Sequence, residues 1–329
     1  MVRFGWCFFH IFNQSGALLG GRQKDGSYDG KERVKKHIVL GIGEILWDLL
    51  PHGKQVGGAP ANFTYHAMAL GAQSYIVSAV GDDPSGREII EHIRQVGLDP
   101  QYIAVDPKYP TGTATVQVDG KGIPSFIIHE GVAWDNIVLT ERAGSLAAIA
   151  DAVCFGTLAQ RSEMSRRSIL RLLEFVPTDC LCIYDVNLRQ SFYTKEVVLE
   201  SLRRCDVLKL NNQELPVVAG LLSISGSESE ILQKIIRDYD LKLIALTLGE
   251  KGSRLASPGD VAFMEAPKVS VVDTVGAGDA FAAALTVGLL EELPLRVIHE
   301  NAARLAGFVC TQRGAIAEIT AIREFMGGI

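Results

Sequence analysis

The sequence predicts an α/β fold: a mostly parallel sheet covered by helices on both faces, with one antiparallel stretch. Short continuous apolar runs alternate with amphipathic helical segments along most of the chain, a pattern typical of parallel strands buried on both sides. Residues 111–130 differ, because apolar residues recur at every second position around Asp119-Gly120. That period and that turn dipeptide predict an antiparallel hairpin.

The individual elements follow from the same patterns and from their end signals. We expect strands at residues 37–51 (broken at Gly41 and Gly43), 74–81, 152–156, 180–187, 207–211, 243–249 and 269–272. We expect helices at residues 61–70, 84–97, 278–290 and 295–311. Gly71 and Gly97 stand where glycine commonly ends a helix, and Pro84 with Ser85 stands where a helix begins.

Length and composition exclude several classes of protein. At about 150 residues per domain, 329 residues make roughly two domains or one large domain with an attachment. The 32 basic and 38 acidic residues give a net charge of −6. A mildly acidic chain has no bulk attraction for nucleic acid or anionic lipid, and no apolar stretch is long enough to span a bilayer. We therefore expect a cytoplasmic protein that binds neither.

Residues 1–36 are expected to be a poorly ordered N-terminal extension, or a stretch upstream of the true start, with the fold beginning near Lys36. A signal peptide is disfavoured because the apolar part is short, contains His10 and lacks a clean cleavage site. The six cysteines are scattered and form no CxxC pair, so neither a disulfide scaffold nor a zinc site is expected.

The strongest candidate site is DTVGAGD, residues 273–279, between an apolar run and an apolar helix. Unpaired N–H groups in the Gly276–Gly278 turn, with the helix macrodipole, form an anion site. Asp279 beside it suits phosphoryl transfer, in which a carboxylate orients and deprotonates a hydroxyl. The alternative is that Asp279 only caps the helix. We expect its place at a helix N-terminus to keep its pKa low.

Further polar clusters follow other predicted strands: Asp48, GGAPANFT (57–64), DVNLR (185–189), NNQE (211–214) and TLGEKGS (247–253). Ligands of parallel sheets bind outside the carboxyl ends of the strands, so these clusters are expected to share one site. Two rival nucleotide motifs are excluded by pattern. The chain has no GxxxxGK[ST], and its GIGEIL and GAGDAF lack the third small residue of a dinucleotide fingerprint.

On these residues the chain resembles the ribokinase/PfkB family of carbohydrate kinases, over about residues 37–323. Its N-terminal motif matches at Gly58, Asn62, Thr64, Gly71 and Gly81, and its C-terminal motif is DTVGAGD. Within the family the chain is most similar to fructokinases, through GEILWDLLP, GGAPANF, EGVAWDNI and DVNLRQSFY. The resemblance implies one kinase domain, 37–329, with a doubly wound sheet and a small β-sheet lid from residues near 44–55 and 111–130.

The resemblance also implies roles for the matched residues. In the transfer site these are Asp279 as base and Gly276, Ala277 and Gly278 as anion hole. In the sugar pocket they are Asp48, Gly58, Asn62 and Arg189, with Asn187 near the phosphate. On the ATP side they are Asn211 and Glu214 of an NxxE motif, Thr247, Gly249 and Gly252 of a turn, and Asn301 at the adenine. Glu214 is expected in the outer shell of Mg²⁺, and Asp273 with the Gly314 loop at a monovalent cation, K⁺.

The resemblance implies ATP-dependent phosphorylation of a primary hydroxyl of a sugar, most simply fructose, with Mg²⁺. Alternatives are another kinase of the family, acting on ribose, 2-keto-3-deoxygluconate or a nucleoside, and a sugar-binding regulator that has lost its chemistry. A nucleotide-dependent oxidoreductase is disfavoured by the missing fingerprint. Relatives also pair through the outer face of the lid, so we expect a homodimer.

Overall fold

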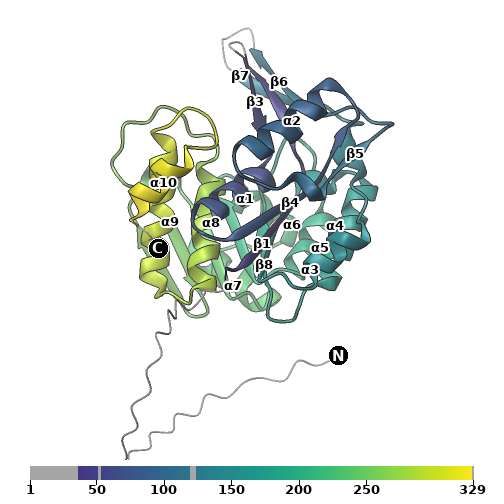
Figure 1. Cartoon of the computed structure of the whole chain (residues 1–329). Coiled ribbons are helices and arrows are strands. Elements are labelled where there is room, and N and C mark those ends of the chain that lie inside the picture. Colours follow the sequence, from purple (N-terminus) through teal and green to yellow (C-terminus); the bar gives the residue numbers. More distant parts are fainter. Residues whose placement is uncertain (1–35, 51–52, 119–123, 328–329) are drawn as a thin grey trace, which may run out of the picture. The chain divides into compact units, whose positions relative to one another are not determined.

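The computed structural model describes residues 36–50, 53–118 and 124–327 (Figure 1). Within these residues nine strands form one sheet in the order β13-β12-β11-β10-β9-β8-β1-β4-β5. They are β1 (Ile38–Ile42), β4 (Gln73–Gly81), β5 (Ile103–Asp106), β8 (Ala152–Gly156), β9 (Leu181–Asp185), β10 (Val207–Asn211), β11 (Leu243–Thr247), β12 (Ser253–Ser257) and β13 (Asp260–Met264). Neighbouring strands from β5 to β11 are parallel, and only β12 and β13 are antiparallel. The predicted mostly parallel sheet is confirmed.

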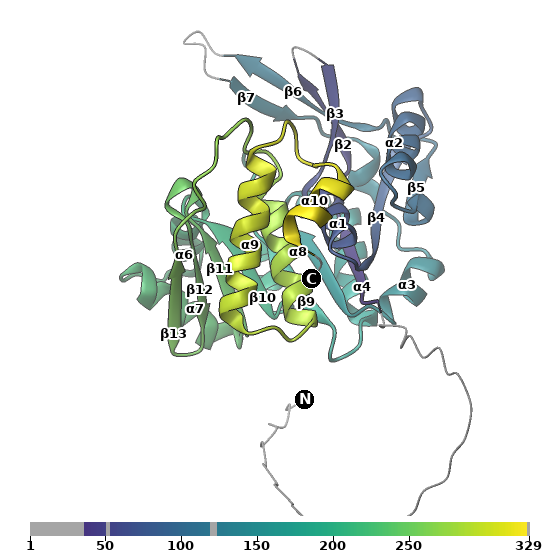
Figure 2. The ribbon, with the colours of Figure 1, turned by 60° about the vertical axis from the view of Figure 1, so that its left-hand side comes forward.

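Helices cover both faces of this sheet (Figure 2). One face carries α1 (Ala59–Ala69), α2 (Pro84–Gln95), α8 (Ala277–Leu290), α9 (Leu295–Cys310) and α10 (Ile319–Met326). The other carries α3 (Glu141–Ala147), α4 (Glu163–Phe175), α5 (Lys195–Leu202), α6 (Glu214–Leu222) and α7 (Glu228–Tyr239). Short 3-10 helices are η1 (Pro100–Tyr102), η2 (Ala133–Asn136), η3 (Leu158–Arg161) and η4 (Gly249–Lys251).

The two cores are separated by the pleat of the strands. In β8, Val153 and Phe155 belong to one core, whereas Ala152 and Cys154 belong to the other. Because successive side chains of a strand point to opposite faces, an uninterrupted apolar run feeds both cores. This is the physical reason why the apolar runs predicted the sheet.

A second, four-stranded sheet has the order β3-β2-β6-β7 and stands at the top of Figures 1 and 2. Its strands are β2 (Leu46–Leu50), β3 (Gly53–Gly57), β6 (Gly112–Val118) and β7 (Pro124–Ile128). The apolar run 37–51 is thus divided after β1 between two sheets. The turn predicted at Asp119-Gly120 lies outside the described residues, as do residues 1–35.

Contacts from several directions tie the second sheet to the main one. Trp47 of β2 donates an indole hydrogen bond of 3.0 Å to the Ser85 carbonyl at the start of α2. The buried side chains of Arg161 and Asp135 form an ion pair with an N–O distance of 2.8 Å. Arg161 also donates a hydrogen bond to the carbonyl of His129, the residue after β7. The Arg161 guanidinium also stacks over the ring of Trp134, 4.0 Å from its centroid. The base of the sheet is therefore fixed.

One predicted strand is wrong. Residues 269–272 form no strand, and Val271 and Val272 are 62% and 60% exposed. The Val272 amide bonds instead to the carbonyl of Cys310, the last residue of α9, at 2.8 Å. β-branched residues favour a strand only where a neighbouring strand can pack against them, and this segment has none. It runs as an extended connection into α8.

The part of the chain that the structure describes holds five of the six cysteines. Cys154, Cys180, Cys182, Cys205 and Cys310 are all free there. The same residues contain no group of three or more His, Cys, Asp or Glu side chains placed to hold a metal. No helix among them has the length and apolar character needed to cross a bilayer.

Candidate functional site

The candidate site lies at the carboxyl edge of the parallel strands, where β9 ends at Asp185, β10 at Asn211 and β11 at Thr247. Since neighbouring parallel strands end at the same edge, these residues meet although they are far apart in sequence. Helix α8 begins at this edge, packed against α1 and the ends of the strands. The predicted clusters are thereby brought together.

The turn before α8 has the geometry of an anion site. Gly276 is the N-cap residue, with φ +78°, and α8 begins at Ala277. A Cβ on Gly276 would lie 2.4 Å from the Ala315 carbonyl oxygen, so only glycine fits. Gly276 has no side chain to satisfy the first N–H groups of the helix, and only a 3.4 Å hydrogen bond joins the Ala277 amide to the Thr274 carbonyl. An anionic group would bind here.

Asp279 lies in the first turn of α8, and its side chain is engaged by another helix. Asn62 Nδ2 of α1 donates a hydrogen bond of 2.8 Å to Asp279 Oδ2. The Asp279 side chain is partly exposed to solvent, although protein atoms surround it closely. Burial raises the pKa of Asp279 to about 6, against the lowering effects of Lys209, Asn62 and Arg189. The expected low pKa is therefore wrong: desolvation outweighs the helix terminus.

Glycines 57 and 58 bring α1 close to the second sheet. Gly58 has φ +115°, and a Cβ there would lie 2.4 Å from the Glu44 carbonyl oxygen. A Cβ on Gly57 would lie 2.2 Å from Asp48 Oδ2, so the carboxylate of Asp48 folds over this glycine. Burial raises the pKa of Asp48 to about 6, and Arg189 opposes the rise. Asp48 of β2 thus faces toward α1 and Arg189.

Arg189 and Asn187 follow β9 and complete this side of the site. Arg189 is exposed, and its positive charge acts on Glu44, Asp48 and Asp279 together. Asn187 adopts φ +38° and lines a small hollow with Asp185 and with Ala59 and Pro60 of α1. Of the residues predicted for the sugar side, Asp48 lies against the glycines before α1, Asn62 of α1 contacts Asp279, and Asn187 and Arg189 follow β9.

The NxxE motif links two loops. Glu214, the first residue of α6, accepts the Asn211 amide on Oε2 at 2.8 Å and the Leu188 amide on Oε1 at 2.9 Å. The Asn211 side chain accepts the amides of Gln213 and Glu214. Burial raises the pKa of Glu214. Because both carboxylate oxygens hold backbone amides, Glu214 suits the outer shell of a hydrated metal rather than direct ligation.

The predicted ATP-side residues form the neighbouring part of the edge. Thr247 ends β11, Gly249 begins η4 with φ +61°, and Gly252 follows η4 with φ +117°. A Cβ on Gly252 would lie 2.0 Å from the Met264 carbonyl oxygen, which requires glycine. Asn301 lies on α9, a helix held against β12 by a hydrogen bond of 2.8 Å between His299 and Ser253. No hydrogen bond found in the described residues joins Asn301 to the other predicted residues.

Asp273 joins the turn before α8 to the Gly314 loop. Its carboxylate accepts the Val275 amide at 3.1 Å and the Gly314 amide at 3.0 Å. Two residues of α1 hold the same loop: His66 bonds the Ala315 carbonyl at 3.0 Å, and the Tyr65 hydroxyl donates to the Ala317 carbonyl at 2.6 Å. Burial lowers the pKa of His66 to about 4, so the imidazole is neutral at physiological pH. These contacts fix the Gly314 loop beside the Gly276–Gly278 turn.

Two charged residues near the site, Lys209 and Glu44, were not among the candidates named from the sequence. Lys209 of β10 lies opposite Asp185 of β9 in the sheet register, and its Nζ is 3.0 and 2.9 Å from the two carboxylate oxygens. Glu44 is buried just after β1, and its Oε2 has no hydrogen-bond partner among the described residues. Burial raises the pKa of Glu44 to about 7. A charged residue inside an apolar run is the feature that could have identified Lys209 and Glu44.

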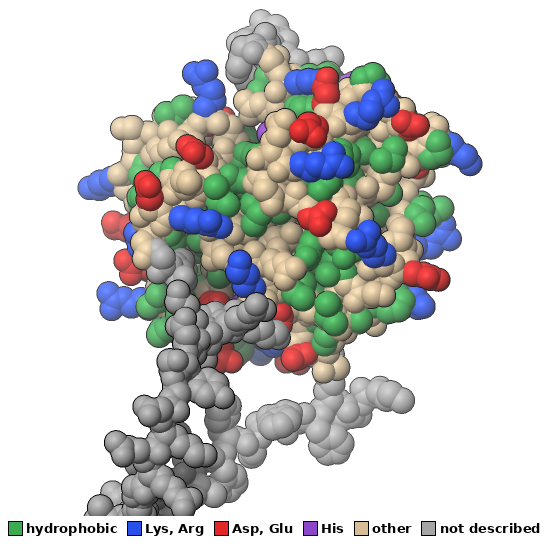
Figure 3. All heavy atoms as spheres, in the orientation of Figure 1, with side chains coloured by type: hydrophobic (Ala, Val, Ile, Leu, Met, Phe, Trp, Pro, Cys, Tyr) green, Lys and Arg blue, Asp and Glu red, His purple; other side chains and the backbone are tan. Residues whose placement is uncertain are grey.

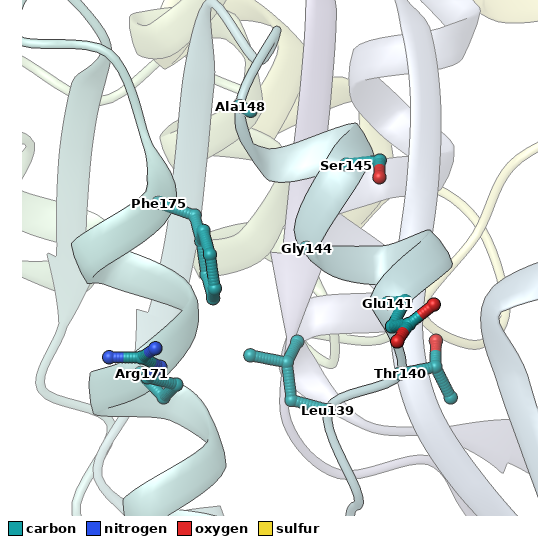
Figure 4. Close-up of a pocket in the computed structure, with 8 residues that line it drawn as sticks. All are labelled: Leu139, Thr140, Glu141, Gly144, Ser145, Ala148, Arg171 and Phe175. Carbon is teal, nitrogen blue, oxygen red and sulfur yellow. The ribbon is translucent and has the colours of Figure 1, made fainter.

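The hollow in Figure 4 is separate from this site. It has a volume of about 440 Å³ and lies between α3 and α4. Phe175 and Leu139 border it, and Gly144 leaves room for the Phe175 ring, which a Cβ would approach to 3.6 Å. None of the predicted site residues lines it. On the face shown in Figure 3, basic and acidic side chains are interspersed, without an extended basic stripe among the described residues.

Comparisons with known proteins agree with this geometry. The model of the pfkB family of carbohydrate kinases matches residues 52–322. A Pyrococcus horikoshii protein named as a sugar kinase is 31% identical over 300 residues, 84% of this chain and 91% of its own. Its crystal structure in complex with ATP has a TM-score of 0.76 and covers 88% of this chain and 99% of its own. A fructokinase of Klebsiella pneumoniae is 29% identical over 276 residues, 80% of this chain and 87% of its own.

Proposed function

Since this chain belongs to the pfkB family of carbohydrate kinases, we propose that it transfers the γ-phosphoryl group of ATP to a primary hydroxyl of the ketohexose fructose. The observation that carries the proposal is the place of Asp279, one helical turn from Gly276 and hydrogen-bonded to Asn62. A hydroxyl beside Asp279 would face a phosphoryl group held at the start of α8. Asp279 accepts the proton of the hydroxyl as the new O–P bond forms.

The charges of the pocket favour a neutral sugar. The positive charge of Arg189 acts on the carboxyl groups of Glu44, Asp48 and Asp279, and Lys209, which is paired with Asp185, acts on Asp279 as well. A sugar acid would bring a further negative charge into this group, at a cost in electrostatic energy. Carboxyl groups that accept or donate hydrogen bonds suit the hydroxyls of a neutral sugar. Fructose, ribose and a nucleoside are thereby favoured over 2-keto-3-deoxygluconate.

The test is a panel of fructose, ribose, 2-keto-3-deoxygluconate and a nucleoside, each with ATP and Mg²⁺, read by ADP release. We expect the highest kcat/KM with fructose. Asp279→Asn is the control, because it should lower the sugar-dependent part of the ADP release alone, by about 10²–10⁴-fold. A higher kcat/KM with another acceptor would replace the proposed substrate, and sugar-independent release in both proteins would contradict the kinase assignment of the site.

We further propose Mg²⁺ and K⁺ as the ions of the reaction. Mg²⁺ would be held by nucleotide phosphates and water, with Glu214 behind the water shell, because both Glu214 oxygens already hold amides. K⁺ would lie near Asp273 and the Gly314 loop, where a carboxylate and a well-placed loop meet. Replacing K⁺ by tetramethylammonium should lower kcat. An unchanged rate would contradict the K⁺ site without affecting the kinase assignment.

The second sheet is proposed to act as a lid whose outer face pairs two copies of the chain. Asp48 of β2 points toward the pocket, and Leu49, the next residue, points the other way and is 37% exposed. Sedimentation equilibrium should therefore give a dimer mass, and a monomer at micromolar concentration would contradict pairing. Free cysteines and the use of ATP support a place in the cytoplasm.

A further inference from the structure

The buried pair of Lys209 and Asp185 lies directly beneath the turn that starts α8. Lys209 Nζ contacts both oxygens of Asp185, and the two residues are only 5% and 4% exposed. A Cβ on Gly278 would lie 2.8 Å from Lys209 Nζ. The ammonium group therefore reaches the first turn of α8, and glycine at position 278 leaves room for it.

Burial lowers the pKa of Lys209, but the carboxyl groups of Asp185, Asp279 and Glu214 raise it overall, so the ammonium group stays charged against the effect of the helix terminus. The N-terminus of a helix carries a partial positive charge, which stabilises anions and repels cations. Burying an ion pair also costs several kcal/mol for each ion, and apolar residues of similar size often stabilise a fold equally well. A lysine held against a helix N-terminus inside an apolar strand is thus poorly explained by stability.

An anion bound at the turn removes the difficulty. The N–H groups of the turn, the end of the helix and the Lys209 ammonium would then all act on the same negative charge. The charge of the Lys209 ammonium group also acts on Asp279, which lies in the same helical turn. Lys209 lowers the pKa of Asp279, whereas Asp185 raises that pKa. The other charged groups that act with Asp279 are Arg189 after β9 and Glu44 after β1; the Cys154 thiol of β8 also lies nearby.

We propose that Lys209 is a positioning residue for phosphoryl transfer: fixed by Asp185, its ammonium group adds positive charge beneath the Gly276–Gly278 turn and beside the carboxyl group of Asp279. The inference rests on the proposed role of Asp279 as the base. Lys209 acts through the turn and through Asp279, and Asp185 sets where the ammonium lies. No bond is made or broken at Lys209.

The experiment compares Lys209→Met and Asp185→Asn with the unaltered protein. The pKa of Asp279 is measured in the free protein by ¹³C NMR of labelled aspartate carboxyls, assigned with Asp279→Asn. We expect the pKa of Asp279 to rise in Lys209→Met and to fall in Asp185→Asn. In kinetics with fructose, kcat of Lys209→Met should fall by about 10²-fold, the usual loss for one group that stabilises transition-state charge, with a smaller change in the KM for fructose.

A purely structural ion pair predicts lower stability for both variants and no opposite shifts of the pKa of Asp279; that result would overturn the proposal. If Lys209→Met does not fold, the double variant Lys209→Met/Asp185→Leu removes the unpaired charge. Its kcat should still be reduced, and a normal kcat in that variant would also overturn the proposal. If the unaltered protein phosphorylates no sugar, the proposed function fails, whereas the NMR titration still decides the coupling of Lys209 to Asp279.

Discussion

Asn62 of α1 and Asp279 of α8 are 217 positions apart in sequence and share a hydrogen bond of 2.8 Å. This bond favours the ionised form of Asp279. Asn62→Ala should therefore raise the pKa of Asp279 above about 6 and move the acidic limb of the kcat/KM profile to higher pH. Hydrogen bonds to charged groups contribute about 1.5–3 kcal/mol, so kcat/KM should fall roughly 10- to 150-fold at neutral pH.

The matched control for that profile is Asn136→Ala, since Asn136 bonds the Val132 carbonyl and no predicted site residue. It should alter stability alone. An acidic limb that stays in place in Asn62→Ala would show that the hydrogen bond does not set the ionisation of Asp279.

Replacing Asp279 itself separates catalysis from capping. Asp279→Asn should lower turnover by about 10²–10⁴-fold, the range for a general acid–base residue, while ATP binding by calorimetry stays close to normal. Its melting temperature at pH 7.5 should not fall, because burial disfavours the carboxylate that is replaced. A carboxylate that only caps the helix predicts normal turnover and a lower melting temperature instead.

Glu44 should make the fold less stable as the pH rises. Its pKa is about 7 in the folded protein and 4.5 in an unperturbed chain, so between these values the folded state holds a proton that the unfolded state has released. Stability is therefore lost as pH rises from about 4.5 to 7. Glu44→Gln should add about 2–3 kcal/mol more to the free energy of unfolding at pH 8 than at pH 5, measured by urea denaturation.

Glu230→Gln is the control of opposite sign. Hydrogen bonds from Ser227 lower the pKa of Glu230 in the capping box of α7, so this variant should lose stability at neutral pH and recover it below the unperturbed pKa. Equal effects of Glu44→Gln at pH 5 and pH 8 would show that Glu44 is ionised throughout.

Two glycines in helices give a matched pair of alanine variants. Gly278→Ala would place a Cβ 2.8 Å from Lys209 Nζ, whereas a Cβ on Gly220 in α6 meets nothing within 4 Å. Gly220→Ala should stabilise the protein by about 0.4–1 kcal/mol and leave kcat unchanged. Gly278→Ala should lower kcat by at least about tenfold, because Lys209 must move from its place beneath the turn. Normal kcat in both variants would show that Lys209 can shift without consequence.

Much of the fold could be predicted from the sequence because the pattern is local. Continuous apolar runs such as 152–156 became strands that feed two cores, and Gly71 follows α1 with φ +106°. The segment 269–272 was mispredicted since its valines give the same local pattern but find no neighbouring strand. Burial decides between these outcomes, and it is a property of the assembled sheet.

Part of the proposed site could also be named from the sequence. Gly276, Asn62 and Asp279 belong to short motifs, so they could be named from spacing alone. The charge of Lys209 inside an apolar run is visible in the sequence, but its partner in another strand, 24 residues away, is not. The direction of the pKa shift of Asp279 could not be predicted either, because a helix terminus can be recognised in the sequence and the degree of burial cannot.

The two amides held by Glu214 have a thermodynamic consequence. One belongs to Leu188, between Asn187 and Arg189, which we propose to bind the sugar, and the other to Asn211, which we propose to lie on the nucleotide side. A displacement of either loop is thus transmitted to the other through a single carboxylate. Ordering of the sugar loop by its ligand would lower the entropic cost of ordering the nucleotide loop, and linkage makes that advantage reciprocal. The two ligands should therefore bind with positive cooperativity, each raising the affinity for the other.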